Sequence, residues 1–369
     1  MRSVVDLVAG ARPNFMKLAP VWRALQAYPD IHRRIVHTGQ HYDRGMNDVF
    51  FEELGIPEPD VHLEVGSGTH GVQTARVLER YEAHLLESPP AATVVFGDVN
   101  STVACALAAV KLRIPVVHVE AGLRSFDRAM PEEINRLLTD ALAELLLVSE
   151  PSGVENLRNE GIDGAKVRLV GNVMIDTLRA ELPAALECGV VERLGFRRRE
   201  YGLVTMHRPS NVDLPEVLRA NLLVLRELSR ELPLVFPVHP RTRRAADRFA
   251  VAELLEPDHT FRTMPPLPYR ENLALMEAAR LVITDSGGMQ EETSVLGVPC
   301  LTMRDNTERP VTVELGTSRL VGRDPARIRS AFQDAITGHW PQGRPIPLWD
   351  GHAGQRAAQE IARWLSSGP

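Results

Sequence analysis

The stretch TDSGGMQEETSVLGVP, residues 284–299, joins the end of an apolar strand pattern to a helix pattern through a Ser-Gly-Gly step. The first turn of a helix leaves backbone N–H groups unpaired and partly positive. Gly287 and Gly288 have no side chains that would keep a ligand away from these groups. The joint therefore predicts a strand-to-helix turn whose helix start binds an anion.

Ser286 has a second interpretation, because serine is also a common N-cap in a tight turn. A capping box would need Glu or Gln three residues later, and Met289 stands there. Glu291 and Glu292 follow one turn further on, far enough from a bound phosphate to accept hydrogen bonds from sugar hydroxyls. The pattern favours a nucleotide, with the phosphate at the glycines and the ribose beyond it, while the simple cap stays open.

Short apolar runs rich in Val, Ile and Leu recur on both sides of this stretch, and helical patterns separate them. Continuous apolar strands that alternate with helices are typical of parallel sheets covered on both faces. The runs fall into two series, at residues 4–10, 34–39, 93–98, 115–120, 145–150 and 167–171, and at residues 202–207, 234–239, 281–286, 299–303 and 318–322. The sequence thus predicts an α/β fold of two Rossmann-like, doubly wound lobes.

Length supports two domains, because 369 residues exceed what one hydrophobic core usually supports. We expect an N-terminal lobe over residues 1–172 and a second lobe over residues 173–350. A last helix, within residues 351–369, is expected to pack back on the first lobe. Ligands of such sheets bind beyond the carboxyl ends of the strands, and two lobes that face a cleft would place the chemistry there.

Composition excludes several classes of function. The formal net charge of −6 and the lack of a long basic run argue against nucleic acid as a partner. No apolar run is long enough for a membrane span and no signal peptide is evident, which predicts a cytoplasmic protein without a membrane partner. Three scattered cysteines indicate neither a disulfide framework nor a zinc site, so no metal is expected. No dinucleotide fingerprint follows the first strand, which argues against NAD.

Acidic residues follow two of the apolar strands. Asp98 and Glu120 are each the first acid at the end of an apolar run, and they would lie close together if the two strands are neighbours. Their repulsion would then raise one pKa, as general acid–base catalysis requires. Asp98 could instead cap the next helix. Glu132 follows Pro131 in a helix start, where an acid and its i, i+4 pair with Arg136 are ordinary structural features.

Basic and histidine side chains also gather at strand ends. Arg12 and Lys17 follow the first strand near Gly10, where cations can meet a phosphate. In the second series, His207 and His239 end two strands at matching positions. Histidine there can contact a phosphate or transfer a proton, although a hydrogen-bonded surface histidine remains an equal alternative.

Taken together, these motifs resemble the non-hydrolysing UDP-N-acetylglucosamine 2-epimerases, in order along the chain from about residue 3 to residue 322. The stretches that carry the resemblance are GARPNFMKLAP, GQHYD, GDVNST, HVEAGLRSFDRAMPEEINR, HRPSNVD, PVHPRTR, TDSGGMQEE and RDNTERP. The resemblance implies the two-lobed GT-B fold, a UDP-sugar substrate, no cofactor and a homodimer. It implies anti elimination of UDP to give 2-acetamidoglucal, after which a proton is replaced on the other face of C2 and UDP returns.

The resemblance also implies roles for single residues and raises Glu132 from a structural acid to a catalytic one. The implied roles are catalytic for Asp98, Glu120, Glu132 and His207, and substrate-binding for Arg12, Lys17, Arg136, Ser286, Gly287, Gly288, Glu292 and Arg309. Which acid is the base stays open. Gln40 and His41 match a regulatory UDP-sugar site of some members, but the residues after them differ, so allosteric activation is not expected.

Three alternatives remain. The substrate could be a related UDP-sugar, such as a UDP-2,3-diacetamido uronic acid. The chain could be a hydrolysing epimerase or a GT-B glycosyltransferase with the same lobes. It could also be a UDP-sugar sensor without activity, which the presence of all three acids and His207 disfavours.

Overall fold

The computed structural model describes residues 3–39, 51 and 53–368, except for the side chain of Arg12, and it forms two compact units. Unit 1 comprises Met1–Arg179 and Pro347–Pro369, and unit 2 comprises Ala180–Ile346. The units therefore divide at 179/180 rather than at 172/173, and the chain returns to unit 1 at Pro347 rather than at residue 351. Among the described residues, no helix has the length and apolar character needed to cross a membrane.

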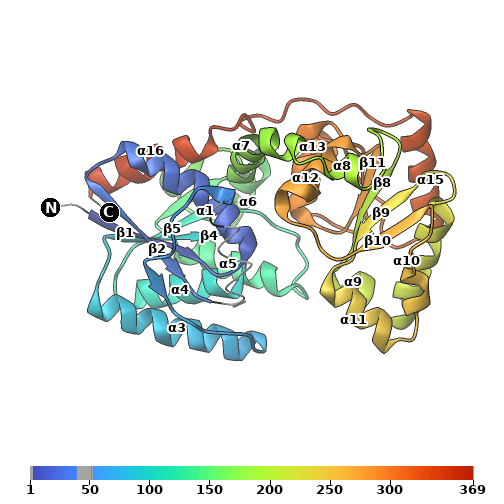
Figure 1. Cartoon of the computed structure of the whole chain (residues 1–369). Coiled ribbons are helices and arrows are strands. Elements are labelled where there is room, and N and C mark those ends of the chain that lie inside the picture. Colours follow the sequence, from blue (N-terminus) through green and yellow to red (C-terminus); the bar gives the residue numbers. More distant parts are fainter. Residues whose placement is uncertain (1–2, 40–50, 52, 369) are drawn as a thin grey trace. The chain divides into compact units, whose positions relative to one another are not determined.

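Unit 1 is built on a parallel sheet of seven strands in the order β3-β2-β1-β4-β5-β6-β7 (Figure 1). Its strands are β1 (Ser3–Ala9), β2 (Ile31–His37), β3 (Val61–His62), β4 (Ala92–Phe96), β5 (Val116–Ala121), β6 (Leu145–Val148) and β7 (Val167–Leu169). Val, Ile and Leu fill the central strands because helices cover both faces and exclude water from both. Each of β4, β5 and β6 is buried throughout.

The helices of unit 1 form two layers around this sheet. The pair α1 and α16 lies on one face, and α3, α4 and α5 lie together on the other (Figure 1). The last helix thus packs against α1, where Gly354 lets the two backbones approach at Pro20. The helices are α1 (Arg12–Ala24), α3 (His70–Glu87), α4 (Asn100–Lys111), α5 (Pro131–Leu142), α6 (Pro151–Asn159), α7 (Val173–Glu187) and α16 (Ala353–Ser367), with short 3-10 turns η1 (Leu25–Ala27) and η2 (Gly164–Lys166).

Unit 2 repeats the plan with a parallel sheet of six strands in the order β10-β9-β8-β11-β12-β13. The strands are β8 (Gly202–Thr205), β9 (Leu234–Pro237), β10 (Phe261–Met264), β11 (Leu281–Thr284), β12 (Cys300–Thr302) and β13 (Ser318–Leu320). The helices are α8 (Val190–Arg193), α9 (Pro209–Val212), α10 (Pro215–Leu228), α11 (Pro240–Arg248), α12 (Tyr269–Ala278), α13 (Gly287–Leu296), α14 (Val311–Glu314) and α15 (Pro325–Thr337), with the 3-10 turn η3 (Ala252–Leu255). The expected α/β architecture of two doubly wound sheets is confirmed.

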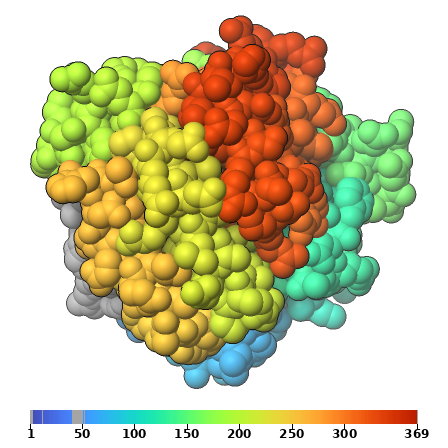
Figure 2. Space-filling model, turned by 90° about the vertical axis from the view of Figure 1, so that its right-hand side faces the viewer, coloured from blue at the N-terminus to red at the C-terminus, as the bar shows by residue number. Residues whose placement is uncertain are grey.

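The core of unit 2 lies between its sheet and the outer helices α10 and α15. Leu218, Leu222 and Leu225 of α10 face inward beside Ile328 and Phe332 of α15. The outer surface of the two helices, yellow and red-orange in Figure 2, carries ion pairs such as Arg329 with Glu227. Exposed pairs of this kind contribute little to stability, so the buried leucines hold this layer.

Candidate active site

The strand order of each sheet reverses at one point, and open α/β sheets bind their ligands there. In unit 1 the reversal lies between β1 and β4, which pair directly, and in unit 2 it lies between β8 and β11. Asp98 follows β4, His207 follows β8, and the Ser-Gly-Gly step follows β11. The predicted site residues therefore lie at the position where the topology of each unit places a ligand site.

Glu120 forms a buried ion pair with Lys17 in unit 1. Lys17 Nζ lies 2.7 Å from Glu120 Oε1, and both residues are buried. Glycine is required at position 97, because a Cβ there would lie 2.7 Å from Lys17 Nζ and φ is +64°. Asn14 of α1 fixes the same strand end by donating to the Phe96 carbonyl at 2.8 Å. Lys17, expected at a phosphate, is here the partner of a carboxylate.

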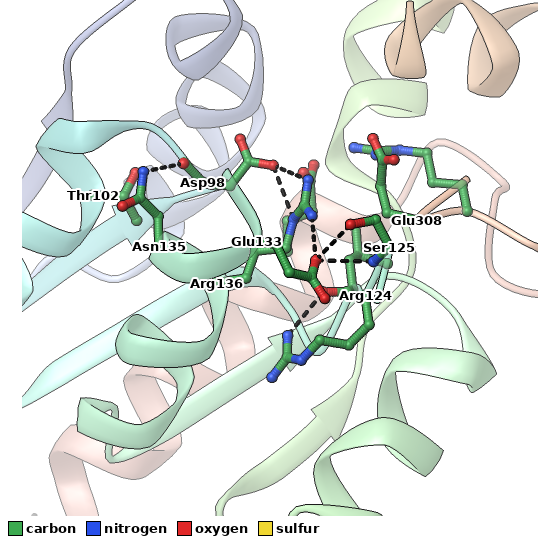
Figure 3. A network of polar contacts seen from close by, with 12 residues as sticks. Asp98, Thr102, Arg124, Ser125, Glu133, Asn135, Arg136 and Glu308 are labelled. Carbon is green, nitrogen blue, oxygen red and sulfur yellow. Dashed lines mark hydrogen bonds and ion pairs between the residues drawn. The ribbon is translucent and has the colours of Figure 1, made fainter. Parts of the chain in front are cut away.

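Asp98 belongs to a polar network that continues into α5 (Figure 3). Arg136 Nε and Nη2 donate to Asp98 Oδ2 at 3.0 and 2.5 Å, and Nη1 donates to Glu133 Oε2 at 2.8 Å. Glu133 also accepts from the backbone N–H groups of Ser125 and Phe126. The network holds the loop after β5 and orients the guanidinium that neutralises Asp98.

These contacts test the predictions made for Asp98 and Glu120. The N-cap of α4 is Val99, without a side-chain hydrogen bond, so Asp98 does not cap this helix. The strands β4 and β5 are neighbours, as the expected proximity of Asp98 and Glu120 requires. Each carboxylate nevertheless has its own cation, so the expected repulsion between two unneutralised acids does not describe this site.

The i, i+4 pair expected between Glu132 and Arg136 is wrong, because Arg136 turns to Asp98 and Glu133. Glu132 is half-buried and makes no hydrogen bond or ion pair with any residue that the structure describes. It therefore keeps a carboxylate that structural contacts leave available. The side chain of Arg12 and the residues Gln40 and His41 lie outside the described part of the chain.

In unit 2, a buried aspartate holds the end of β8 against the end of β11. Asp285 accepts from the backbone N–H groups of His207 and Arg208 at 2.9 and 2.8 Å, and from Asn211 Nδ2 at 3.0 Å. His207 Nδ1 lies 3.1 Å from Asp285 Oδ1. Burial raises the pKa of Asp285, but the hydrogen bond and charge of His207 and the other donors outweigh it and lower the pKa to about 2.

The two histidines predicted at matching strand ends meet in unit 2, with ring centroids 5.1 Å apart. Burial and the neighbouring His207 lower the pKa of His239 to about 4. His239 Nδ1 accepts from the backbone of Arg241 and so caps α11. The half-exposed His207 contacts the buried Asp285 through Nδ1, and this contact can orient the other side of the imidazole toward a ligand.

The start of α13 lies beside Glu308 and Arg309, and Arg208 and Arg304 pair with Glu308. Ser286 occupies the N-cap position without a side-chain capping bond, so its hydroxyl does not pair with the N–H groups of the first turn. A Cβ at Gly287 would lie 2.9 Å from Glu308 Oε1 and 3.2 Å from Arg309 Nη1. Burial raises the pKa of Glu308, but the arginines around it outweigh burial and hold the pKa well below its usual range. The turn thus combines unpaired N–H groups with guanidinium groups, which suits a diphosphate.

Glu292, in the second turn of α13, carries a buried carboxyl group that Tyr269 reaches. Tyr269 Oη donates to Glu292 Oε1 at 2.7 Å. Burial raises the pKa of Glu292 to about 7, with a further contribution from Glu291, while the Tyr269 bond opposes the shift. Glu291 is bound by Arg309. The two adjacent glutamates therefore differ, because Glu291 pairs with an arginine and Glu292 accepts a hydrogen bond from a tyrosine.

This shift predicts that stability falls as the pH rises. The pKa of Glu292 is raised to about 7, so the folded chain keeps a proton that the unfolded chain loses near its ordinary pKa. The protonated Glu292 contributes fully to the free energy of unfolding below the unfolded pKa, and this contribution is lost as the pH rises through about 7. The loss in free energy of unfolding is about 3 kcal/mol. Denaturant unfolding of the wild type and Glu292→Gln across this range measures it. Identical pH dependence in both proteins would contradict the prediction.

Sequence reasoning missed three residues that the structure places at these strand ends. Asp285 lies within the stretch 284–299. Like Asp98, it is an acidic residue directly after an apolar strand, so the same pattern could have identified it. Arg304 and Glu308 lie within RDNTERP. Their part became visible only in the structure, where Glu308 lies beside Gly287 at the start of α13 and Arg304 donates to Glu308.

One sheet thus has carboxylates after its strands, and the other has a helix that starts with glycines beside Arg309. This is the arrangement that the resemblance implied for an enzyme acting on a nucleotide-activated sugar. The family model for UDP-N-acetylglucosamine 2-epimerase matches residues 23–362. The chain belongs to this family. The resemblance seen in the motifs is confirmed.

Relatives and solved structures agree with this assignment. The chain is 41% identical to UDP-N-acetylglucosamine 2-epimerase of Methanocaldococcus jannaschii, over 99% of each chain. It is 42% identical to UDP-2,3-diacetamido-2,3-dideoxy-D-glucuronate 2-epimerase of Pseudomonas aeruginosa, over 97% of this chain and 98% of that one. A crystal structure of the M. jannaschii enzyme in complex with UDP-GlcNAc and UDP matches with a TM-score of 0.90, at 39% identity, over 98% of this chain and 100% of that one.

A more distant likeness concerns the fold alone. A UDP-glucosyltransferase from Polygonum tinctorium, whose structure was solved in complex with 3,4-dichloroaniline, matches at 16% identity with a TM-score of 0.59. This places the architecture among the GT-B folds, as expected, and says nothing about the reaction.

Proposed function

We propose that the protein interconverts UDP-N-acetylglucosamine and UDP-N-acetylmannosamine by elimination and re-addition of UDP, without net hydrolysis. The proposal rests on the family, on the relative that was crystallised with UDP-GlcNAc and UDP, and on the two groups of site residues. The observation that supports it most is that unit 1 has carboxylates at its strand ends and unit 2 has a helix that starts with two glycines and has no side-chain cap.

The chemistry explains why both groups are needed. The C2 hydrogen of the sugar is not next to a carbonyl group, so it becomes acidic only as the C1–O bond breaks and the ring gains oxocarbenium character. Negative charge then passes to the β-phosphate. The N–H groups at Gly287 and Gly288, with Ser286 and Arg309, would stabilise that charge, and electrostatic stabilisation of this kind is commonly the largest catalytic contribution.

The carboxylates of unit 1 would transfer the proton and stabilise the positive ring. Asp98 pairs with Arg136 and Glu120 pairs with Lys17, and each carboxylate would act as a base or as a negative charge beside C1 and C2. Glu132 provides a carboxyl group that the described contacts do not occupy. Protonation of the glycal on the opposite face requires a second acid, which is the reason that more than one carboxyl group is present.

The remaining residues would bind the nucleotide. Glu292 would accept from the ribose hydroxyls, and His207, held by Asp285, would contact the departing diphosphate. Arg12 would complete the phosphate environment. A homodimer and a cytoplasmic location stay predictions from the resemblance and from composition.

Incubation with UDP-N-acetylglucosamine in D2O, followed by NMR, tests this function. The proposal predicts deuterium at C2 in both epimers and a constant total of UDP-sugar, because the reaction returns UDP to the sugar. Accumulation of free UDP and N-acetylmannosamine would show hydrolysis instead. An unchanged C2–H signal with no glycal would refute the substrate.

A UDP-2,3-diacetamido uronic acid is the second candidate substrate, because the Pseudomonas relative named for that sugar is as similar as the UDP-N-acetylglucosamine 2-epimerases. The two sugars differ at C3 and C6 but share the C1 and C2 groups at which the reaction occurs. Parallel assays of C2 exchange with both decide between them, and the higher kcat/KM identifies the substrate.

A further inference from the structure

A buried pair of charged groups lies under the carboxyl ends of β4 and β5 and takes no part in the chemistry above. His118 of β5 is 0% exposed and Asp140 of α5 is 1% exposed. His118 Nδ1 lies 2.6 Å from Asp140 Oδ1. Removing two charges from water costs free energy, so such a pair is kept only where its contacts are well made.

The ring of His118 faces an acceptor at each nitrogen. Nε2 lies 2.8 Å from the carbonyl oxygen of Gly97, which can only accept. Asp140 receives the backbone N–H of Gly122 at 3.0 Å and Arg124 Nη1 at 2.7 Å on its other oxygen. Burial raises the pKa of Asp140, but His118 and Arg124 more than offset it and lower the pKa. With Asp140 ionised, both ring nitrogens of His118 face acceptors, an arrangement in which each nitrogen can donate a hydrogen bond.

His118 and Asp140 each contact a backbone group close in sequence to a carboxylate proposed as catalytic. Gly97 directly precedes Asp98, and Gly122 follows Glu120 by two positions. The values of φ are +64° at Gly97, +73° at Glu120 and +79° at Gly122. A glutamate in the left-handed region is uncommon and persists only where its surroundings hold it. The pairing of β5 with β6 also shifts between Val119 and Ala121, at this residue.

We infer that His118 and Asp140 are positioning residues for the proposed epimerisation. Their ion pair fixes the Gly97 carbonyl and the Gly122 N–H, and so holds Asp98 and Glu120 in the backbone conformations that aim their carboxylates. Arg124 anchors the pair in turn through its bonds to Glu160 at 2.7 and 2.6 Å. The inference rests on the proposed function, because it assigns the pair to the same reaction.

Unit 1 contains a second His–Asp pair that provides a matched control. His84 Nε2 lies 3.3 Å from Asp6 Oδ2, and Asp6 is buried in the middle of β1. Tyr81 and Arg34 donate to the same carboxylate. This pair does not touch the residues that flank Asp98 and Glu120, so its loss costs stability without moving them.

The kinetic test compares His118→Gln, Asp140→Asn and His84→Gln in the full-length protein. A displaced reacting group costs about 100-fold in rate, so we expect kcat to fall by about that factor in the first two variants. KM should change little, because the helix start of α13 is intact. We expect His84→Gln to keep the kcat of the wild type. Equal kcat in His118→Gln and His84→Gln would overturn the inference.

A spectroscopic test keeps the inference falsifiable even if His118→Gln does not fold. Nitrogen-15 NMR of the wild type with labelled histidine, at neutral pH, should show two protonated ring nitrogens for His118, and Asp140→Asn should remove one proton. A neutral His118 ring in the wild type would contradict the ion pair. This measurement does not depend on activity, so it separates a failure of the inference from a failure of the proposed function, in which the wild type itself would show no C2 exchange.

Discussion

Replacing Asp98 by Asn is expected to lower kcat for epimerisation about 1000-fold, within the range that a positioned acid or base contributes. The amide can neither take nor return the C2 proton, and it no longer offers a negative charge beside the oxocarbenium-like ring. Arg136, which donates twice to Asp98 Oδ2, keeps its bond to Glu133, so the helix that carries it should remain in place. Steady-state kinetics in both directions, with C2 exchange in D2O, provide the measurement.

Glu144→Gln is the matched control for this variant. It also removes one carboxylate from unit 1, but Glu144 is largely exposed and pairs with Lys166 at 2.8 Å. Surface pairs of this kind contribute little, so activity should be that of the wild type. If Asp98→Asn retained activity within a few-fold of this control, the assignment of Asp98 to the chemistry would be wrong.

The second large effect is expected from Gly288→Ala. A Cβ at Gly288 would meet no neighbouring heavy atom within 4 Å among the described residues. Alanine has a higher helix propensity than glycine, so the fold should be kept or slightly stabilised. A methyl group at the helix start would nevertheless occupy the space proposed for the diphosphate. We expect UDP to bind at least about 100-fold more weakly, because the lost contacts are charge-assisted. Calorimetric titration with UDP measures the change.

Gly71→Ala separates this effect from a general effect of the methyl group. Gly71 also lies in the first turn of a helix, α3, and a Cβ added there would meet no neighbouring heavy atom within 4 Å in the described part of the chain. UDP affinity should be unchanged in this variant. If Gly288→Ala bound UDP as tightly as Gly71→Ala does, the diphosphate would not lie at the start of α13.

Much of the fold could be predicted from local pattern, because the central strands are apolar along their whole length. Two strands escaped prediction, β3 and β10, and both lie at the outer edge of their sheets. β3 has only two residues, and β10, with the sequence FRTM, mixes one buried residue with partly exposed ones. Edge strands are short and half-exposed, so their sequences lack the continuous apolar run that marked the others.

The sequence predicted which acidic residues follow the strands, but not which cations pair with them. Asp98 and Glu120 were identified by their place after apolar strands, which parallel topology brings to one edge. Their cations come from α1 and α5, and these contacts depend on how the helices pack. Arg136 illustrates the limit. Helical spacing favoured a pair with Glu132, whereas in the folded chain Arg136 pairs with Asp98, after β4, and with Glu133 of its own helix.

Positional isotope exchange tests most directly whether the C1–O bond breaks while the C2 proton is removed. UDP-N-acetylglucosamine labelled with oxygen-18 in the bridge between C1 and the β-phosphate is incubated with the wild type in D2O. Departure of UDP predicts that the label spreads into the non-bridging oxygens of the β-phosphate as deuterium enters C2. Deuterium at C2 with the oxygen-18 still in the bridge after many turnovers would contradict the elimination of UDP.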